Sequence, residues 1–523
     1  MNAEKKLKQS NLGTVRTRFA PSPTGPIHIG SIRTALFNYL FAKKNNGKFI
    51  LRVEDTDMER SKPEWEHQMI KIFEWLKLDW DEGPLSGQQI FDFDNYKINY
   101  VGPHAPYRQS ERKEIYKKYL QKLLDEDKAY YCFCNKEEVE AQKQYLMSMG
   151  QPPVYMGKCR ELSKDQVAEF FALGKSAVIR FKCPENHKIV FEDIIKGKVE
   201  FNSDVMGDFV IAKDLENPLY NFTVVVDDAE MEINYVIRGD EHLPNAPKQI
   251  LLIEALGLSI PNYAHMPLIL GENKKKLSKR DGKTSVVDYK EDGYLPEALI
   301  NFIAFLGWNP GTEKEIYTID ELINDFSLEK IQKSGAIFNI DKLDWINGFY
   351  IRKKPLNELT EQLIPYFKKA EFIEENGAEI YIIKETQEEI SFNTLTKIVL
   401  LYQERLKKLS DIIELTDLFF KKELDYDPEL LNWKQMPKQE LINSLKKSHE
   451  IMESISEIDF NKSNLEKVIL PEAEKMPNRG NLLWPLRVAL TGKKNSAGPM
   501  DIAEVLGKKE SQKRIEKAIK LIS

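Results

Sequence analysis

The stretch that decides the fold is residues 15–31, which read VRTRFAPSPTGPIHIGS. Val15, Thr17 and Phe19 alternate as one face of a β-strand does, and a proline-rich turn follows. Residues 33–44 repeat apolar side chains at helical spacing, and residues 49–53 form a compact apolar run. A strand, a helix and a strand within about 45 residues predict a βαβ unit and hence a parallel sheet.

His28 and Gly30 stand at the predicted start of this helix, with Ser31 as the expected N-cap. A helix N-terminus directs backbone N–H groups at an anion, and a glycine lets that ligand approach the backbone. An imidazole at this place can contact the phosphates of a nucleotide. We therefore interpret the turn as a phosphate site; the alternative is a surface histidine in a turn.

A second candidate for phosphate binding is a basic loop, in which Gly271 and Gly282 permit movement. Residues 274–283 contain six basic side chains: Lys274, Lys275, Lys276, Lys279, Arg280 and Lys283. Two lysines three residues apart can close over the same phosphates from the other side. The alternative is a solvated loop or a nonspecific site for polyanions.

Composition sets broad limits on the protein. The chain has 523 residues, 42% hydrophobic and 30% charged, as expected for a globular protein of several domains. Membrane-length apolar runs and a secretory signal in residues 1–13 are not evident. Four cysteines argue against a disulfide-built fold, so we expect a cytoplasmic location. The net charge of −6 neither favours nor excludes nucleic acid.

The pattern changes along the chain. Residues 111–127 indicate a helix, and the four cysteines and short strand-like runs follow it. Residues 221–226 and 233–238 again have the apolar character of buried strands. Beyond Phe338 helical spacing prevails nearly to the end. This order predicts an α/β sheet interrupted by an insertion and followed by a helical half.

The motifs together carry a family resemblance. The ordered pair of His28-Ile-Gly30 and KLSKR at residues 276–280 resembles the signature of class I aminoacyl-tRNA synthetases. RFAPSPTG at residues 18–25 and RVEDTD at residues 52–57 closely resemble segments of the glutamyl- and glutaminyl-tRNA synthetases. With YRQS at 107–110 and WING at 345–348, the resemblance covers essentially the whole chain and is close to specific for bacterial-type glutamyl-tRNA synthetases.

Three positions depart from the family pattern. Leu277 and Arg280 replace the Met and Ser of the common form KMSKS; leucine keeps the apolar packing and arginine adds charge. Ser31 stands where the wider class has a second histidine, so no role of that imidazole carries over.

The resemblance implies an α/β fold with a Rossmann-type class I catalytic domain. It implies this division: catalytic domain, 14–107 and 219–254; inserted acceptor-end-binding domain, 108–218; stem-contact region with the Lys276–Arg280 loop, 255–337; all-α anticodon-binding region, 338–523, with two subdomains split near 415.

The implied activity is that of a monomeric glutamate–tRNA ligase. It uses ATP with Mg²⁺ to form glutamyl-adenylate and transfers the glutamyl group to the 3′ end of tRNA-Glu. By resemblance, His28 and Lys279 are catalytic. The implied ATP-binding residues are His28, Gly30, Glu241, Ile269, Lys276, Ser278 and Lys279. The implied glutamate-binding residues are Arg18, Ala20, Ser22, Glu54, Tyr220, Val224 and Arg238.

The residues themselves support a glutamate site. Arg18 and Arg238 both fall at carboxyl ends of predicted strands, where ligands of open α/β sheets bind. The bidentate fork of arginine suits a carboxylate, and glutamate has two carboxylates. Which arginine takes which carboxylate is left open. The alternative for an arginine in a buried strand is a salt bridge.

Cys132, Cys134 and Cys159, with Tyr155, resemble the zinc site of some bacterial glutamyl-tRNA synthetases. Three thiolates at this spacing can hold a tetrahedral zinc ion. Cys183 and His187 are further candidate ligands, and three reduced structural cysteines are the alternative.

Arg405 concerns the choice of tRNA. It follows Leu395, Ile398 and Val399, which mark one helix, and it falls where the family uses an arginine to read the last anticodon base. That base is C in tRNA-Glu and G in tRNA-Gln. The alternative is a solvent-facing arginine on a helix.

Four other functions are alternatives to a glutamate–tRNA ligase specific for tRNA-Glu. A glutaminyl-tRNA synthetase would have an anticodon region of β-barrels, and a shorter relative that glutamylates a modified tRNA base would have no anticodon half. A non-discriminating ligase would also charge tRNA-Gln. A non-catalytic tRNA-binding paralogue would be expected to have lost His28 or Lys279, and both are present.

Overall fold

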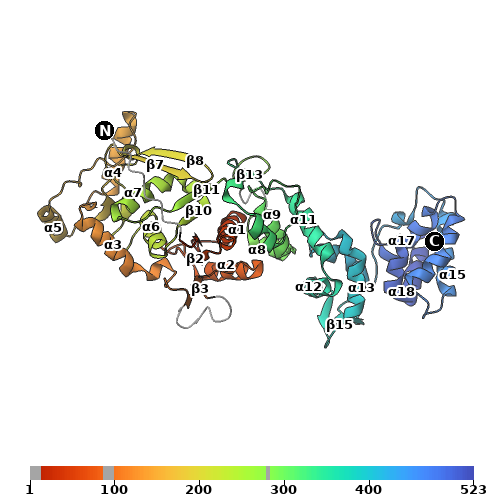
Figure 1. The fold of residues 1–523 in the computed structure, drawn as a ribbon. Helices are drawn as coiled ribbons and strands as arrows, with labels where there is room; N and C mark the ends of the chain where they lie inside the picture. Colours follow the sequence, from red (N-terminus) through yellow and green to blue (C-terminus); the bar gives the residue numbers. More distant parts are fainter. Residues whose placement is uncertain (1–12, 86–98, 278–282) are drawn as a thin grey trace. The chain divides into compact units, whose positions relative to one another are not determined.

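The computed structural model of the protein describes residues 13–85, 99–277 and 283–523. The chain divides into two compact units, Met1–Glu291 with Pro296–Leu343 and Asp292–Leu295 with Asp344–Ser523. The first unit mixes strands and helices, and the second is mainly helical (Figure 1). Among the helices of the described ranges, none is both long and apolar enough to cross a membrane.

The predicted βαβ unit is confirmed. Strand β1 (Arg16–Phe19) pairs in parallel with β2 (Lys48–Leu51), and α1 (Ile29–Lys44) connects them. Ile32, Leu36 and Leu40 lie on one face of α1 and are fully buried, so the helix is held by its apolar stripe. The predicted N-cap is wrong: α1 begins at Ile29 and its N-cap is His28, not Ser31.

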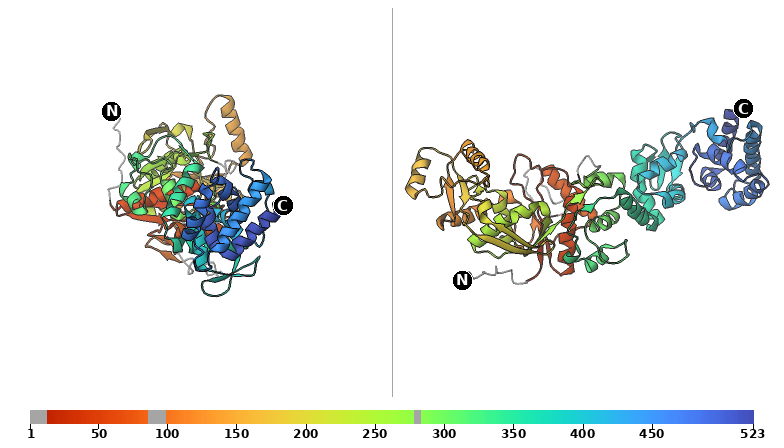
Figure 2. Two further views of the ribbon diagram at one scale, coloured as in Figure 1. Left: turned by 90° about the vertical axis from the view of Figure 1, so that its right-hand side faces the viewer. Right: turned by 90° about the horizontal axis from the view of Figure 1, so that it is seen from above.

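A four-stranded sheet positions much of the site. Its order is β10 (Tyr235–Gly239), β11 (Asn262–Met266), β7 (Lys188–Asp193) and β8 (Gly197–Asn202). β10 and β11 are parallel, whereas β7 and β8 form an antiparallel hairpin (Figures 1 and 2). The hairpin comes from the segment predicted as an insertion, yet it hydrogen-bonds to β11.

The prediction of a strand at residues 221–226 is wrong, because this segment lies in helix α6 (Tyr220–Glu230). Three consecutive valines, Val224 to Val226, favour a strand by their branching. In the structure, residues Phe222 through Asp227 are all buried, so no polar face reveals the helical period. The N-cap Leu219 also makes no side-chain capping bond that would mark the start.

The remaining elements of the first unit surround these. The other strands are β3 (Gly83–Pro84), β4 (Tyr100–Val101), β5 (Ala129–Cys132), β6 (Val178–Phe181), β9 (Val210–Ala212), β12 (Ile269–Leu270) and β13 (Ala336–Ile337). The other helices are α2 (Pro63–Leu76), α3 (Lys113–Asp125), α4 (Lys136–Ser148), α5 (Lys164–Ala172), α7 (Ala246–Leu256), α8 (Val286–Asp292), α9 (Pro296–Ala304) and α10 (Ile319–Asp325).

The second unit is largely, but not wholly, helical. Its helices are α11 (Ile340–Lys353), α12 (Leu356–Lys369), α13 (Phe392–Tyr402), α14 (Asp411–Thr416), α15 (Lys438–Ser454), α16 (Lys462–Glu474), α17 (Gly480–Thr491) and α18 (Pro499–Ile522). Helices α15, α17 and α18 pack on one another (Figures 1 and 2). An antiparallel sheet of β14 (Ile373–Glu375), β15 (Ile380–Ile383) and β16 (Glu389–Ser391) corrects the all-α expectation. Its strands are short and mostly exposed, so their sequence signal is weak.

Candidate functional site

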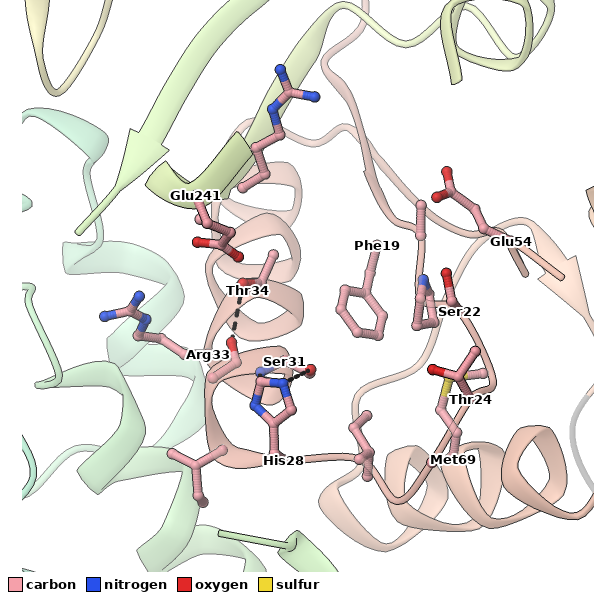
Figure 3. Close-up of a pocket in the computed structure, with 18 of the residues that line it drawn as sticks. Phe19, Ser22, Thr24, His28, Ser31, Arg33, Thr34, Glu54, Met69 and Glu241 are labelled. Carbon is pink, nitrogen blue, oxygen red and sulfur yellow. Dashed lines mark hydrogen bonds between the residues drawn. The ribbon is translucent and has the colours of Figure 1, made fainter. Parts of the chain in front are cut away.

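The first turn of α1 borders a cavity (Figure 3). The Ser31 backbone N–H donates to His28 Nδ1 at 3.3 Å, which fixes the imidazole over the helix start. Gly30 leaves room for this ring, since a Cβ on it would lie 3.0 Å from the His28 imidazole. The His28 side chain is exposed to the cavity, but the protein around it removes part of its hydration, which lowers the pKa of the imidazole. The positive charge of nearby Lys276 lowers that pKa further. The His28 imidazole therefore faces the cavity at the helix start, while the backbone N–H groups of Ile29, Ser31 and Ile32 already have partners within the protein.

Arg18 and Glu54 border the cavity where β1 and β2 end, and a buried ion-pair network holds them. Arg18 Nε donates to Asp228 Oδ1 at 3.1 Å, and Arg52 donates to the same carboxylate at 2.7 Å. Arg52 also donates to Glu54 at 3.0 Å. Burial raises the pKa of Glu54, while Arg52 and Arg18 oppose that rise. Sequence reasoning missed Asp228 in the valine-rich run and the role of Arg52 in RVEDTD.

Arg238 on β10 is buried at 4% exposure and lines the same cavity. Its Nε donates to His265 Nε2 at 3.0 Å. Within the described ranges, its terminal nitrogens Nη1 and Nη2 are buried without a hydrogen-bond partner, and no carboxylate pairs with it. The alternative that Arg238 forms a salt bridge is therefore not supported within the described ranges. Two unpartnered guanidinium nitrogens are what an incoming carboxylate requires.

Tyr220 and His242 meet beside Arg238. The Tyr220 hydroxyl lies 3.2 Å from His242 Nδ1, and both side chains line the cavity. Burial and the Arg238 charge lower the pKa of His242 to about 4, so this imidazole is neutral at physiological pH. His242 was not predicted as a site residue.

The cavity has a volume of about 680 Å³, within the usual range for small-molecule sites. Every predicted ATP- or glutamate-binding residue that the structure describes lines it: Arg18, Ala20, Ser22, His28, Gly30, Glu54, Tyr220, Val224, Arg238, Glu241, Ile269 and Lys276. Ser278 and Lys279 lie outside the described residues. Figure 3 shows Ser22 and Glu54 across the cavity from His28, Ser31 and Glu241.

Both described ends of the basic loop are attached to the cavity wall. The Leu277 N–H donates to the Ile269 carbonyl at 3.0 Å, and Lys276 and Leu277 line the cavity. At the other end, the Ile29 N–H donates to the Thr284 carbonyl at 3.1 Å. The described flanks of the basic segment therefore lie at the cavity, beside the start of α1.

The predicted zinc ligands come together. The sulfur atoms of Cys132, Cys134 and Cys159 all lie within 4.8 Å of one another. The Tyr155 hydroxyl lies 3.4 Å from Cys132 Sγ and 3.3 Å from Cys134 Sγ. All four cysteines are free thiols, as expected.

The two further zinc candidates lie elsewhere. Cys183 belongs to a different hydrophobic cluster from the three grouped cysteines, and His187 pairs with Glu254 at 3.3 Å. The structure therefore does not bring these two side chains to the group.

Arg405 is exposed, with its guanidinium carbon 5.9 Å from the centre of the Tyr402 ring. Its predicted position on the helix is wrong, because α13 ends at Tyr402 and Arg405 ends the short 3-10 turn Gln403–Arg405. The turn still presents the side chain to solvent.

Two known protein families match this chain. Residues 14–345 match the family model of the catalytic domain of class I tRNA synthetases (E and Q), and residues 358–519 match that of an anticodon-binding domain. These matches define a class I aminoacyl-tRNA synthetase, which uses ATP.

Individual relatives show which amino acid-specific family within this class the chain resembles. The chain is 44% identical to the glutamate–tRNA ligase of Carboxydothermus hydrogenoformans and 46% identical to glutamate–tRNA ligase 1 of Caldicellulosiruptor saccharolyticus. The alignments cover 96% of this chain and 99% and 98% of those proteins, respectively. The chain belongs to the glutamate–tRNA ligase family. It also resembles the crystal structure of a glutamate tRNA ligase from Elizabethkingia meningosepticum in complex with its amino acid, with a TM-score of 0.83 and 34% identity over 98% of this chain and all of that one (100%).

Proposed function

We propose that this enzyme binds glutamate at Arg18, Glu54, Tyr220 and Arg238, and ATP at the start of α1, in one continuous cavity. The observation that carries the proposal is Arg238, whose two terminal nitrogens are buried and unpartnered among the described residues. A buried cation with free donors is costly unless a ligand completes it. Glu54, also buried, suits the ammonium group of the same ligand.

The chemistry follows from this arrangement. A carboxylate oxygen of glutamate attacks the α-phosphorus of ATP, the bond to pyrophosphate breaks, and glutamyl-adenylate forms. A ribose hydroxyl of the terminal adenosine of tRNA-Glu then attacks the acyl carbon, loses its proton, and AMP leaves. Mg²⁺ bound together with ATP would neutralise phosphate charge.

The chain supplies charge and position to these steps. His28 at the start of α1 faces the phosphates, and Lys276 and Lys279 add positive charge from the basic loop. Lys279 acts on the negative charge that develops at the α-phosphate during the reaction.

Aminoacylation tests the function directly. Purified tRNA-Glu and tRNA-Gln are each offered glutamate and glutamine, and we expect glutamyl-tRNA-Glu as the main product. Glutaminyl-tRNA would indicate the glutaminyl enzyme, although the largely helical second unit disfavours its β-barrel anticodon region. Loss of all charging would indicate a non-catalytic paralogue.

We further propose that Arg405 reads the last anticodon base. Its exposure on a turn and its position within the matched anticodon-binding region support this role. An unstacked C presents acceptors that match an arginine donor. We expect the enzyme to prefer tRNA-Glu over tRNA-Gln, and Arg405→Gln to reduce that preference by about 1–3 kcal/mol. The ratio of kcat/KM for the two tRNAs measures it.

Lys397 on α13 provides a matched control, since it is also basic and exposed. Lys397→Gln should leave the ratio unchanged. Equal charging of both tRNAs by the parent enzyme would defeat the Arg405 proposal and indicate a non-discriminating ligase.

A structural zinc ion at Cys132, Cys134, Cys159 and Tyr155 is a separate proposal. Two sulfurs that share a tetrahedral zinc lie about 3.8 Å apart, given Zn–S bonds of about 2.3 Å. Cys134 Sγ and Cys159 Sγ are 3.7 Å apart. Burial acts to raise the pKa of Cys132, but its hydrogen bonds with Tyr155 and Arg180 lower it overall; burial and the neighbouring thiols raise the pKa of Cys134 to about 11, a rise that a bound zinc ion would oppose.

Elemental analysis after expression with ample zinc should find close to one equivalent per chain. Cys159→Ser should remove most of it, whereas Cys183→Ser should not, because Cys183 lies in another cluster. Less than about a tenth of an equivalent in the parent protein would leave three reduced structural cysteines as the interpretation.

The domain division and the monomeric state are proposals of the same kind. Light scattering at working concentration tests the monomeric state.

A further inference from the structure

A buried chain of hydrogen bonds runs across three neighbouring strands to Arg238. Arg238 on β10 stands opposite His265 on β11, and Asp193 ends β7 on the far side of β11. Arg238 Nε lies 3.0 Å from His265 Nε2, and His265 Nδ1 lies 2.6 Å from Asp193 Oδ2. Asp193 and His265 are at most 2% exposed.

The donors in this chain fix the tautomer of His265. A guanidinium only donates, so His265 Nε2 must carry the lone pair that accepts the Arg238 Nε–H. The proton of the neutral ring is then on Nδ1, where it donates to Asp193. Burial lowers the pKa of His265, with Arg238 adding to this and Asp193 opposing it, which agrees with a neutral ring.

Asp193 is itself held as an ionised acceptor. Its Oδ1 accepts the backbone N–H groups of Ile195 at 3.0 Å and Lys196 at 2.8 Å, and its Oδ2 accepts that of His265 at 3.1 Å. Although burial acts to raise the pKa of Asp193, the hydrogen bond with the His265 side chain and those from the backbone N–H groups of Lys196 and His265 hold it below its ordinary value. The carboxylate is therefore rigidly placed and cannot turn away from the ring without losing several bonds.

We propose that Asp193 and His265 are positioning residues, which aim the two terminal nitrogens of Arg238 at a carboxylate of bound glutamate without neutralising the guanidinium. A carboxylate in direct contact with Arg238 would compete with the substrate for its charge, whereas a neutral imidazole holds the side chain by Nε alone. The inference rests on the proposed role of Arg238 in glutamate binding.

The test is Asp193→Asn, which keeps the shape but offers an amide N–H to His265 Nδ1. Its oxygen can still accept the backbone N–H groups of Ile195 and Lys196. His265 then carries its proton on Nε2 instead of Nδ1, so that its N–H points at the Arg238 Nε–H and the hydrogen bond between them is lost. Replacing a carboxylate by an amide has this effect on a buried histidine in other enzymes. We expect the KM for glutamate to rise about tenfold or more, with the KM for ATP changed less than about twofold.

Glu192→Gln is the matched control. It makes the same acid-to-amide change one residue away on β7, where the side chain is exposed, and should leave both KM values unchanged. His265→Phe removes the acceptor and should weaken glutamate binding as Asp193→Asn does. His265→Gln restores an acceptor oxygen for Arg238 and should recover part of the loss.

Labelling with ¹⁵N-histidine provides a readout that does not depend on the folding of a variant, since the chain has only 7 histidines. In the parent enzyme, His265 should show a protonated Nδ1 and a bare Nε2. The reverse tautomer would overturn the proposal.

The kinetic outcomes distinguish the positioning role of Asp193 and His265 from the glutamate-binding role of Arg238. If Arg238→Ala weakens glutamate binding but the folded Asp193→Asn and His265→Phe enzymes do not, the positioning role is wrong and the glutamate role of Arg238 stands. If Arg238→Ala also has no effect on glutamate, both are wrong.

Discussion

Replacement of Lys279 by alanine is expected to lower the rate of glutamyl transfer by about 10²-fold or more while tRNA affinity stays nearly intact. The substrate already carries charge in the ground state, but the equatorial oxygens of the α-phosphate gain charge only as the reaction proceeds. An ammonium placed there acts mainly on the transition state and so on kcat. Lys279 lies outside the described residues, but the described flanks of its loop, Lys276–Leu277 and Thr284–Ser285, line the cavity. Steady-state aminoacylation and filter binding of tRNA measure the two quantities.

Lys275→Ala is the control for loop charge, since Lys275 is exposed and does not line the cavity. It should change kcat by less than about threefold. A kcat for Lys279→Ala within about twofold of the parent would contradict the catalytic assignment. His28→Ala should act in the same direction as Lys279→Ala, because the imidazole faces the same phosphates.

Arg238→Ala should raise the KM for glutamate far more than the KM for ATP. Loss of the charge-assisted partner of a buried carboxylate costs about 2–5 kcal/mol, which is about thirtyfold to several thousandfold in affinity. The side chain is 4% exposed, so solvent screening reduces this little. Isothermal titration with glutamate alone gives the change without contribution from the chemical step.

Arg238→Lys keeps the charge but loses the fork of two donors, so it should fall between the parent and Arg238→Ala. Equal increases in both KM values would indicate that Arg238 has a structural role instead. That outcome would also require a partner for its terminal nitrogens, which the described residues do not offer.

The motifs could be named from the sequence because each is a contiguous stretch, whereas the local structure around them was harder to predict. RFAPSPTG, the His28 turn and Glu54 of RVEDTD line one cavity. The N-cap was misplaced because Ser31 is the commoner capping residue, whereas the His28 ring itself accepts the Ser31 N–H. Helix α6 was misread because it is buried on nearly all sides.

The partners of the predicted residues could not be found from the sequence. Asp193 and His265 are 72 positions apart and meet only because β7 and β11 are neighbours in the sheet. Asp228 likewise reaches Arg18 across 210 positions. No local periodicity or motif encodes such contacts, because strand order is set by the packing of the whole domain.

The ion pairs around the glutamate end have a consequence for net charge. Arg18, Arg52 and Arg238 contribute three guanidinium groups, whereas Glu54 and Asp228 contribute two carboxylates. Both carboxylates pair with Arg18 and Arg52, whereas Arg238 has no direct carboxylate partner among the described residues; the ionised Asp193 reaches it only through the neutral His265.

Asp227 does not alter this balance, because Arg112 pairs with it at 2.7 Å. Free glutamate carries one net negative charge at neutral pH, and glutamine carries none. In the proposed binding mode, glutamate therefore brings one more negative charge to this end of the cavity than glutamine does, and it does so beside Arg238, which has no direct carboxylate partner among the described residues. The proposed site would distinguish the two amino acids by total charge, in addition to any single hydrogen bond that distinguishes a carboxylate from an amide.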